Sequence, residues 1–132
     1  MIYELQIGTN AKTELLDITS KVQKLIQDIN FQNGICTIFV PHTTAAITIN
    51  ENADSTVKED MLMELNKVIP FNDNYQHLEG NSAAHIKSTL VGCSQQIIIK
   101  EGNLVLGTWQ GIYFCEFDGP RKRKIKLKLI SE

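Results

Sequence analysis

The final strand-like segment alternates strictly between charged and apolar side chains. Within residues 122–130, KRKIKLKLI, lysines and aliphatic residues take alternate positions from Lys124 to Leu129. Successive side chains of a β-strand point to opposite faces, so this period predicts a strand with one face in water and the other in a core. The alternating residues are Lys124, Lys126 and Lys128 against Ile125, Leu127 and Leu129. The chain is therefore expected to build a sheet that is packed on one side.

Other segments predict a mixture of strands and helices. Strands are expected at residues 1–7, 13–19, 35–41, 42–51, 95–100 and 104–117, and helices at 19–34, 55–69 and 82–92. The expected helix caps are Thr19 or Ser20, Asp54 or Ser55, and Ser82, with Asn33-Gly34 and Gly92 at two of the C-termini. Helices placed between strand pairs predict an α+β fold, a mainly antiparallel β-sheet sandwich with packed helices. Its length predicts one domain over residues 1–132.

Composition excludes several classes of protein. Hydrophobic residues make up 42% and charged residues 21% of the chain, which is ordinary globular usage. No apolar run approaches the ~20 residues of a membrane span, and no signal peptide is evident, so we expect a cytoplasmic protein with no membrane contact. Three separated cysteines argue against a disulfide framework or a cysteine zinc site. Cys115 could be a nucleophile, although an inert buried thiol is the favoured interpretation.

Basic charge is concentrated at the end of the chain. Residues 121–132 hold six Lys/Arg against one Asp/Glu, whereas residues 1–120 hold seven against fourteen. Such a cluster can bind nucleic acid. However, a strand with one wet face explains the lysine alternation, and the whole chain is slightly acidic, so nucleic acid is not the expected partner. Arg121, at the preceding turn, is the better candidate for pairing with a carboxylate or phosphate.

The segment VPHTTAAITINENAD, residues 40–54, carries unusually many hydrogen-bonding groups for an apolar strand. Its period-two faces are His42, Thr44, Ala46, Thr48 and Asn50 on one side and Thr43, Ala45, Ile47, Ile49 and Glu51 on the other. The first face is polar and small, and we expect it to form one wall of a ligand pocket. Glu51 could be a general base or the partner of a histidine, whereas Asp54 is better explained as a helix cap.

Three histidines lie in or beside polar segments: His42, His77 and His85. Their spacing matches no local metal motif, and a single histidine is usually solvated or satisfied in a core. Together they could bind a divalent cation and leave a position open for substrate. If protonated, they could instead bind an anion. Both interpretations stay open.

The only tryptophan, Trp109, lies between Gly107 and Gly111. Glycines in a strand often mark a bulge or the close approach of another group. With Gln110 beside it, Trp109 could hold a flat ring by stacking and amide hydrogen bonds, although a core position is the commoner use of tryptophan.

Three segments together resemble the YjbQ family, also called secondary thiamine-phosphate synthase enzymes. They are HTTAAITINENAD, EGN followed by AHIKSTLVG, and GTWQGIYFCEFDGPRKRK. The resemblance extends over essentially the whole chain. It implies an α+β sandwich that assembles as a homotrimer, with a polar pocket built from the three motifs. The family's polar positions correspond here to His42, Thr44, Asn50, Glu51, Asn52, Asp54, His77, Glu79, His85, Lys87, Trp109, Gln110 and Glu116.

The resemblance also implies an activity. It suggests a metal-assisted enzyme acting on a small phosphorylated substrate, with weak thiamine-phosphate synthase activity that joins a pyrimidine pyrophosphate to a thiazole phosphate. The three histidines would hold a zinc or magnesium ion, the metal and Lys87 would offset the leaving pyrophosphate, and Glu51 or a histidine would move protons. The alternative is a noncatalytic trimeric module that binds a metal or a small anion.

Overall fold

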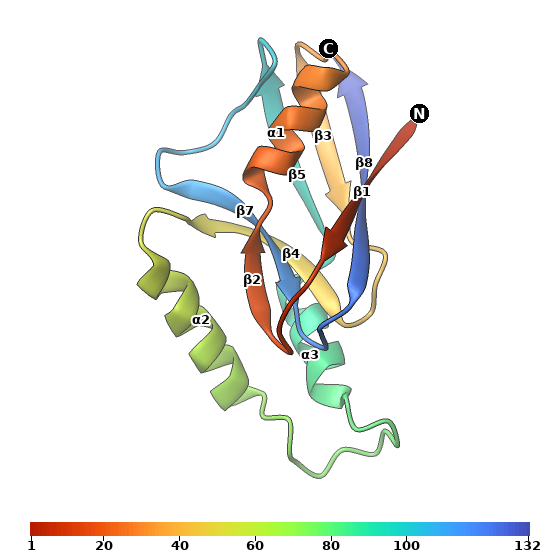
Figure 1. The fold of residues 1–132 in the computed structure, drawn as a ribbon, viewed down its shortest axis with the longest axis vertical. Helices are drawn as coiled ribbons and strands as arrows, with labels where there is room; N and C mark the ends of the chain where they lie inside the picture. Colours follow the sequence, from red (N-terminus) through yellow and green to blue (C-terminus); the bar gives the residue numbers. More distant parts are fainter.

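A five-stranded and a three-stranded β-sheet stack on each other in this computed structural model, which describes residues 1–132 (Figure 1). The strands are β1 (Ile2–Gly8), β2 (Glu14–Asp17), β3 (Gly34–Phe39), β4 (Ala45–Glu51), β5 (Ser94–Lys100), β6 (Asn103–Leu104), β7 (Gln110–Glu116) and β8 (Lys122–Ser131). The helices are α1 (Thr19–Asp28), α2 (Ser55–Val68) and α3 (Ser82–Val91). The predicted α+β class is confirmed.

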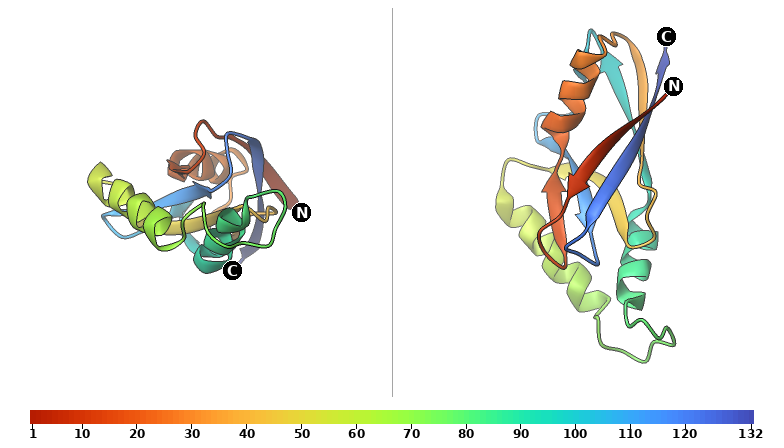
Figure 2. Two further views of the ribbon diagram at one scale, coloured as in Figure 1. Left: turned by 90° about the horizontal axis from the view of Figure 1, so that it is seen from below. Right: turned by 45° about the vertical axis from the view of Figure 1, so that its right-hand side comes forward.

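Both sheets are antiparallel throughout. The larger one has the order β1-β8-β3-β5-β6, and the smaller one has the order β2-β7-β4. β1 and β8 pair along their length, which brings the two ends of the chain to the same side of the molecule (Figures 1 and 2). None of the three helices is long and apolar enough to cross a membrane.

The main core lies between the two sheets and under α1. Its side chains come from the inner face of the larger sheet, one face of the smaller sheet and the buried side of α1. Ile38, Leu127, Ile47, Phe114 and Val22 represent these three sources and are all fully buried. α1 belongs to this layer because Val22 and Ile26, one turn apart, point to the same side of the helix.

A smaller core covers the other face of the three-stranded sheet. Leu15, Ala46 and Cys115 from the strands pack with Ala84 of α3, and α2 adds partly buried side chains. The three-stranded sheet is therefore the middle layer, which explains why β7 is buried on both faces after its first residue. No α2 residue is fully buried, and Val68 at its end lies mostly in solvent.

Strand β8 has the predicted alternation. Ile125 and Leu127 are buried, whereas Lys124, Lys126 and Lys128 lie on the opposite, solvent-facing side. One charged residue breaks the rule: Arg123 is in phase with the isoleucine and leucine and is itself buried.

Helix boundaries depart from several predictions. Asp17 Oδ1 accepts hydrogen bonds from the Thr19 amide (2.9 Å) and the Thr19 hydroxyl (2.6 Å). The side chain that accepts from the first residue of α1 is therefore Asp17, which precedes the predicted caps Thr19 and Ser20. α1 ends at Asp28, before the predicted Asn33-Gly34, and Asn30 adopts φ 56°. Asn81 takes the predicted cap position of Ser82 without a side-chain bond, whereas the Asp54 cap of α2 and Gly92 beyond α3 are confirmed.

The long strand predicted at residues 104–117 is divided in two. β6 ends at Leu104, and β7 begins only at Gln110. Gln110 closes a turn between them: its side-chain Oε1 accepts from the Gly107 amide (2.8 Å), and its backbone amide donates to the Gly107 carbonyl (3.0 Å). Trp109 is consequently held in a turn with 63% of its surface exposed, and it is not a core residue.

Candidate functional site

Polar side chains converge where the segment before β4, the loop before α3 and the turn before β8 meet. They enclose a hollow of about 380 Å³ with no hydrophobic residue in its lining. We call it the histidine hollow; its lining residues are Thr43, Thr44, His77, Glu79, Asn81, His85, Asp118, Arg121 and Arg123. All three segments of the YjbQ resemblance contribute residues to its lining.

Two of the three histidines are in contact in this hollow. The rings of His77 and His85 lie edge to face, with centroids 5.6 Å apart. His77 comes from the loop before α3, and Nε2 of its ring is 3.9 Å from Glu79 Oε2. His85 lies on α3, one helical turn after Ser82. The pair thus places a carboxylate and two imidazoles beside one another, a set able to transfer protons.

His42 lies in an adjoining groove that also reaches His85. The groove, about 440 Å³, is lined by His42, Thr43, His85, Ser88, Thr89, Gly92 and Cys93. His42 Nε2 accepts a hydrogen bond from the Lys124 amide at 3.1 Å. Burial, and then the charge of Arg123, lower the pKa of His42 below its ordinary value. A neutral imidazole whose Nε2 accepts carries its proton on Nδ1, so His42 is a donor with no free lone pair.

These positions do not fit the predicted metal centre of three histidines. No three histidine, cysteine, aspartate or glutamate side chains of the chain are placed to hold a metal ion. His42 in particular has no nitrogen lone pair to offer, because the Lys124 amide occupies Nε2. His77 and His85 are the only histidine pair in contact.

A buried ion pair lies beneath the histidine hollow. Arg123 Nε donates to Glu116 Oε1 at 2.9 Å, and Arg123 Nη2 donates to Glu116 Oε2 and to Thr44 Oγ1, the latter at 2.8 Å. Thr9 Oγ1 adds a 2.7 Å bond to Glu116 Oε1. Burial alone raises the pKa of Glu116, but hydrogen bonds from Arg123, Thr9 and the Asp118 amide outweigh it and hold that pKa below the ordinary value.

Sequence reasoning missed Arg123 and placed Glu116 among the polar positions of the pocket that the resemblance implies. Glu116 has no exposed surface and does not line the hollow, whereas Arg123 does line it. A signal was present: Arg123 is two residues before Ile125, and therefore on the inward side of β8. An arginine whose side chain points into the protein needs a carboxylate partner. Glu116 is that partner, and it lies on β7 between β2 and β4.

Arg121, the predicted partner of a carboxylate or phosphate, is tied to Asp118. Its Nε donates to the Asp118 carbonyl at 2.7 Å and its Nη2 to Asp118 Oδ2 at 3.1 Å. Asn81 Nδ2 donates to the same carboxylate oxygen at 3.0 Å. Burial raises the pKa of Asp118, but the bonds from Asn81 and Arg121 lower it by more. Asn81 Oδ1 is the one buried side-chain polar atom of the chain without a hydrogen-bond partner.

Lys87, predicted to be catalytic, does not line the histidine hollow. Its side chain is fully buried on the other side of α3, where Nζ donates to Asn66 Oδ1 at 2.7 Å. Nζ also lies 3.9 Å from the centroid of the Phe71 ring, and Lys12 Nζ lies 4.0 Å from it. Burial, and then the nearby charge of Lys12, lower the pKa of Lys87. This lysine joins α3 to α2 and the following loop.

Five predicted site residues gather at the opposite end of β4: Asn50, Glu51, Asn52, Trp109 and Gln110. The register pairs Glu51 with Gln110 and Asn50 with Gly111, while Thr44 precedes the first residue of β4. Glu51 follows Thr44 by seven residues of extended chain, roughly 20 Å. Glu51 is therefore not a partner of the histidines; its carboxylate accepts from the Ala53 amide at 3.1 Å.

This far end of β4 has a hollow of its own. It measures about 570 Å³, and Asn52 and Asp17 line it together with residues of α1 and Leu104 and Leu106. Asn52 Nδ2 donates to Asp17 Oδ2 at 3.3 Å, and the backbone amide of Asn52 donates to the Trp109 carbonyl at 2.9 Å. Polar chemistry is consequently present at both ends of β4.

The polar face predicted for β4 does not form a pocket wall along its length. Ala46 on that face is fully buried and packs with Ala84 of α3. Small side chains let the helix approach closely, and the helix then covers the face. Only His42, Thr43 and Thr44, which precede the strand, line the histidine hollow or its adjoining groove.

The buried cysteines are unreactive. Burial raises the pKa of Cys36 to about 11 and that of Cys115 to about 12, so neither is a thiolate near neutral pH. The favoured interpretation of Cys115 as an inert packing residue agrees with this.

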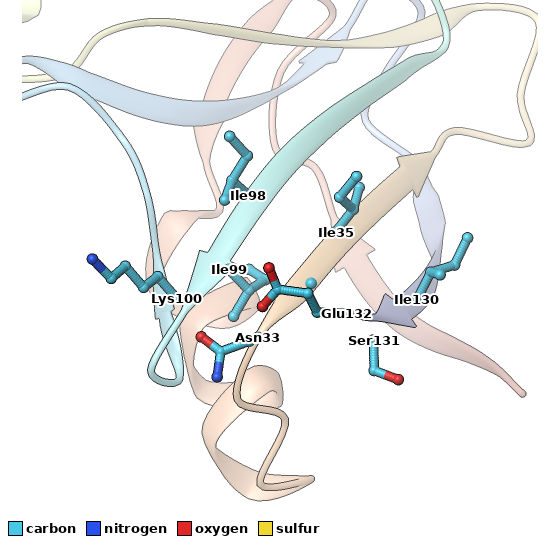
Figure 3. A pocket seen from close by; sticks show the side chains of 9 residues that line it. Asn33, Ile35, Ile98, Ile99, Lys100, Ile130, Ser131 and Glu132 are labelled. Atoms are coloured by element: carbon cyan, nitrogen blue, oxygen red, sulfur yellow. The ribbon is translucent and has the colours of Figure 1, made fainter.

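A further hollow lies on the outer face of the larger sheet, at the end formed by β3, β5 and β8 (Figure 3). It measures about 490 Å³ and displays Ile35, Ile98 and Ile130 in one cross-strand row. Lys100 and Glu132 are its only charged side chains, so it offers no cluster for catalysis.

Comparison with known proteins identifies the family. The model of the family described as UPF0047 protein YjbQ-like matches residues 3–132. The chain belongs to the YjbQ family.

YjbQ relatives resemble the chain over its full length. A UPF0047 protein of Methanocaldococcus jannaschii is 57% identical, with 100% of this chain and 96% of the relative covered. The UPF0047 protein YugU of Bacillus subtilis is 51% identical, with 99% and 100% covered. A YjbQ/UPF0047 crystal structure from Clostridium acetobutylicum has 53% identity and a TM-score of 0.93, with 97% of this chain and 99% of that chain covered.

Most of the YjbQ positions named in the sequence fall into two groups, whereas Lys87 and Glu116 are buried outside both. His77, Glu79 and His85 lie at the histidine hollow, with His42 beside it. The group that includes Glu51 and Trp109 lies at the far end of β4.

Proposed function

We propose that the chain is an enzyme that acts on a small phosphorylated substrate in the histidine hollow, with thiamine-phosphate synthesis as its named activity. The observation that carries this proposal is the composition of the hollow: two arginines, a contacting histidine pair and two carboxylates, with no hydrophobic lining. Arginine N–H groups suit phosphate oxygens, and imidazoles suit proton transfer near neutral pH.

The reaction would need two services from these groups. A pyrimidine pyrophosphate loses pyrophosphate as its carbon forms a bond to the ring nitrogen of the thiazole phosphate. The N–H donors of Arg123 would stabilise the charge that develops on the leaving pyrophosphate, whereas those of Arg121 are engaged by Asp118. His85, in contact with His77, would supply or remove a proton at the reacting groups.

A direct assay tests this proposal. Purified protein is given the two precursors, and thiamine phosphate is measured for the wild type, His85→Ala and Leu90→Ala. Leu90 is the matched control, since it lies on the same helix with 66% of its surface exposed. We expect His85→Ala to lower the rate by about 10²-fold or more and Leu90→Ala to leave it unchanged. Equal traces of product from all three proteins would contradict the enzyme and favour the noncatalytic module.

Metal assistance, which the resemblance implies, has a test of its own. Metal analysis of tag-free protein would support it if one zinc or magnesium ion per chain is found and is lost in His85→Ala. Metal-free protein with full activity would contradict it.

We also propose that the chain assembles as a homotrimer in the cytoplasm. The uncovered row of Ile35, Ile98 and Ile130 supports self-association, because an exposed apolar patch often marks an interface. Light scattering should give three times the chain mass for the wild type and a smaller mass for Ile98→Asp. A monomeric wild type would contradict the trimer, and cell fractionation tests the location.

A further inference from the structure

We propose that Arg123 is the residue that binds phosphoryl oxygens in the histidine hollow, and that Glu116 is a positioning residue that aims it. The inference rests on the proposed function, because it names the anion-binding group of the same site.

One end of the Arg123 guanidinium is free. All hydrogen bonds of its side chain use Nε and Nη2, which donate to Glu116 and Thr44. Nη1 makes none. Nη1 is also not sealed inside the protein. Asn81 Oδ1 is the only side-chain polar atom that is both fully buried and without a partner, so the unpartnered Nη1 must reach the surface. Since Arg123 lines the hollow, its unpaired N–H donors face that space.

The guanidinium is held still by its other end. The Glu116 carboxylate accepts from both Nε and Nη2, and Thr9 and the Asp118 amide fix that carboxylate in turn at 2.7 Å and 3.0 Å. Arg123 is only 6% exposed. A donor that is already fixed loses little side-chain entropy when a ligand binds, so its contribution to affinity is larger.

Charge neutralisation shapes this contribution. Glu116 offsets the charge of Arg123, so the ion pair has little net charge with which to attract an anion. It attracts an anion mainly through the directed N–H groups of Arg123, which lie at the positive end of the ion pair's dipole. Phosphate binding by exposed cations weakens steeply with salt, whereas buried interactions are screened much less. We therefore expect weak salt dependence for the wild type.

Arg121 is the contrasting group in the same hollow. Its side chain is 55% exposed, and its contacts go to Asp118, three residues before it. An exposed pair of this kind contributes little, because solvent screens it and the long side chain stays mobile. Arg121 consequently serves as the matched control for Arg123.

Titration calorimetry with inorganic pyrophosphate separates the two arginines. Arg123→Lys keeps a positive charge opposite Glu116 but loses the second pair of N–H groups, so we expect affinity to fall by about tenfold or more. Arg121→Lys should change it by less than about threefold. Equal affinity for the wild type and Arg123→Lys would overturn the role of Arg123 alone. A wild type that binds no pyrophosphate would instead contradict the proposed phosphorylated substrate itself.

The role of Glu116 is read from salt dependence. Glu116→Gln frees the charge of Arg123 and loosens its orientation, so pyrophosphate should bind more weakly at moderate salt and with a steeper dependence on ionic strength. A variant with the wild-type salt slope would contradict the positioning role. If that variant does not fold, nitrogen NMR of the wild type still decides: pyrophosphate should shift the Arg123 Nη signals, and unshifted signals would overturn the inference.

Discussion

The protonation state of His42 is set by one hydrogen bond from strand β8. The Lys124 amide donates to His42 Nε2, and protonation of the ring would break this bond. Because burial and Arg123 lower the pKa of His42, the unfolded chain binds the proton at a higher pH than the folded chain. The stabilisation is present above the unfolded pKa of about 6.5 and is lost as pH falls through the folded value.

We therefore expect folding stability to depend on His42 between neutral and mildly acidic pH. Glutamine at this position can accept a similar bond but does not titrate. On lowering the pH from 7.5 to 5.5, the unfolding free energy of the wild type should decrease more than that of His42→Gln, as measured by urea denaturation. Parallel pH profiles for the two proteins would show that His42 is not the titrating group.

A substitution at Lys87 distinguishes a structural role of this residue from a catalytic one. It is buried without a carboxylate partner, against the Phe71 ring and Asn66. Methionine fills a similar volume without a buried charge, so Lys87→Met should leave stability unchanged or raise it by up to ~1 kcal/mol. Pyrophosphate affinity should stay within about twofold of the wild type, since Lys87 is outside the hollow. Loss of pyrophosphate binding in calorimetry would restore the catalytic role.

At the scale of elements, the turn between β7 and β8 fixes the ion pair. A Cβ atom at Gly119 would overlap the Ala11 carbonyl oxygen and would come within 2.7 Å of Glu116 Cγ and 3.0 Å of Thr9 Oγ1. These neighbours are backbone or members of the Glu116 network, so they have little room to move. The absence of a side chain at Gly119 is thus a condition for the placement of Glu116.

Gly119→Ala should consequently destabilise the fold by about 1–3 kcal/mol, as overpacking does. Gly8→Ala is the matched control, because a Cβ at Gly8 would meet no heavy atom within 4 Å. That control should change stability by less than ~0.5 kcal/mol. Urea denaturation of both variants checks the difference, and a Gly119→Ala protein as stable as the control would refute the crowding argument.

Period-two alternation predicted β8 correctly because one face of the larger sheet meets water and the other meets the core. The same rule misjudged β4, since the three-stranded sheet is the middle layer and α3 covers the face predicted to be polar. The segment at residues 104–117 was predicted as one strand because the side chain of Gln110, which closes the turn, has no distinctive sequence pattern. Pattern rules detect exposure to water, and they cannot distinguish which neighbour covers a face.

For the whole molecule, the sequence identified the segments that meet at the histidine hollow but not their arrangement. Each of the three YjbQ motifs reaches the hollow, although Lys87, Glu51 and Trp109 do not. Strand direction explains this: a continuous motif such as residues 42–54 runs the length of β4, so its two ends are roughly 20 Å apart. The closeness of these residues in sequence predicted one site, but the extended backbone of β4 places them in two separate sites.

A crystal structure of the protein soaked with the pyrimidine pyrophosphate tests the central claim most directly. We expect its phosphoryl groups against Arg123 in the histidine hollow, with the rest of the molecule extending toward His85. Ligand density in the hollow of Asp17 and Asn52, or on the outer row of Ile35, Ile98 and Ile130, with none beside Arg123, would contradict it.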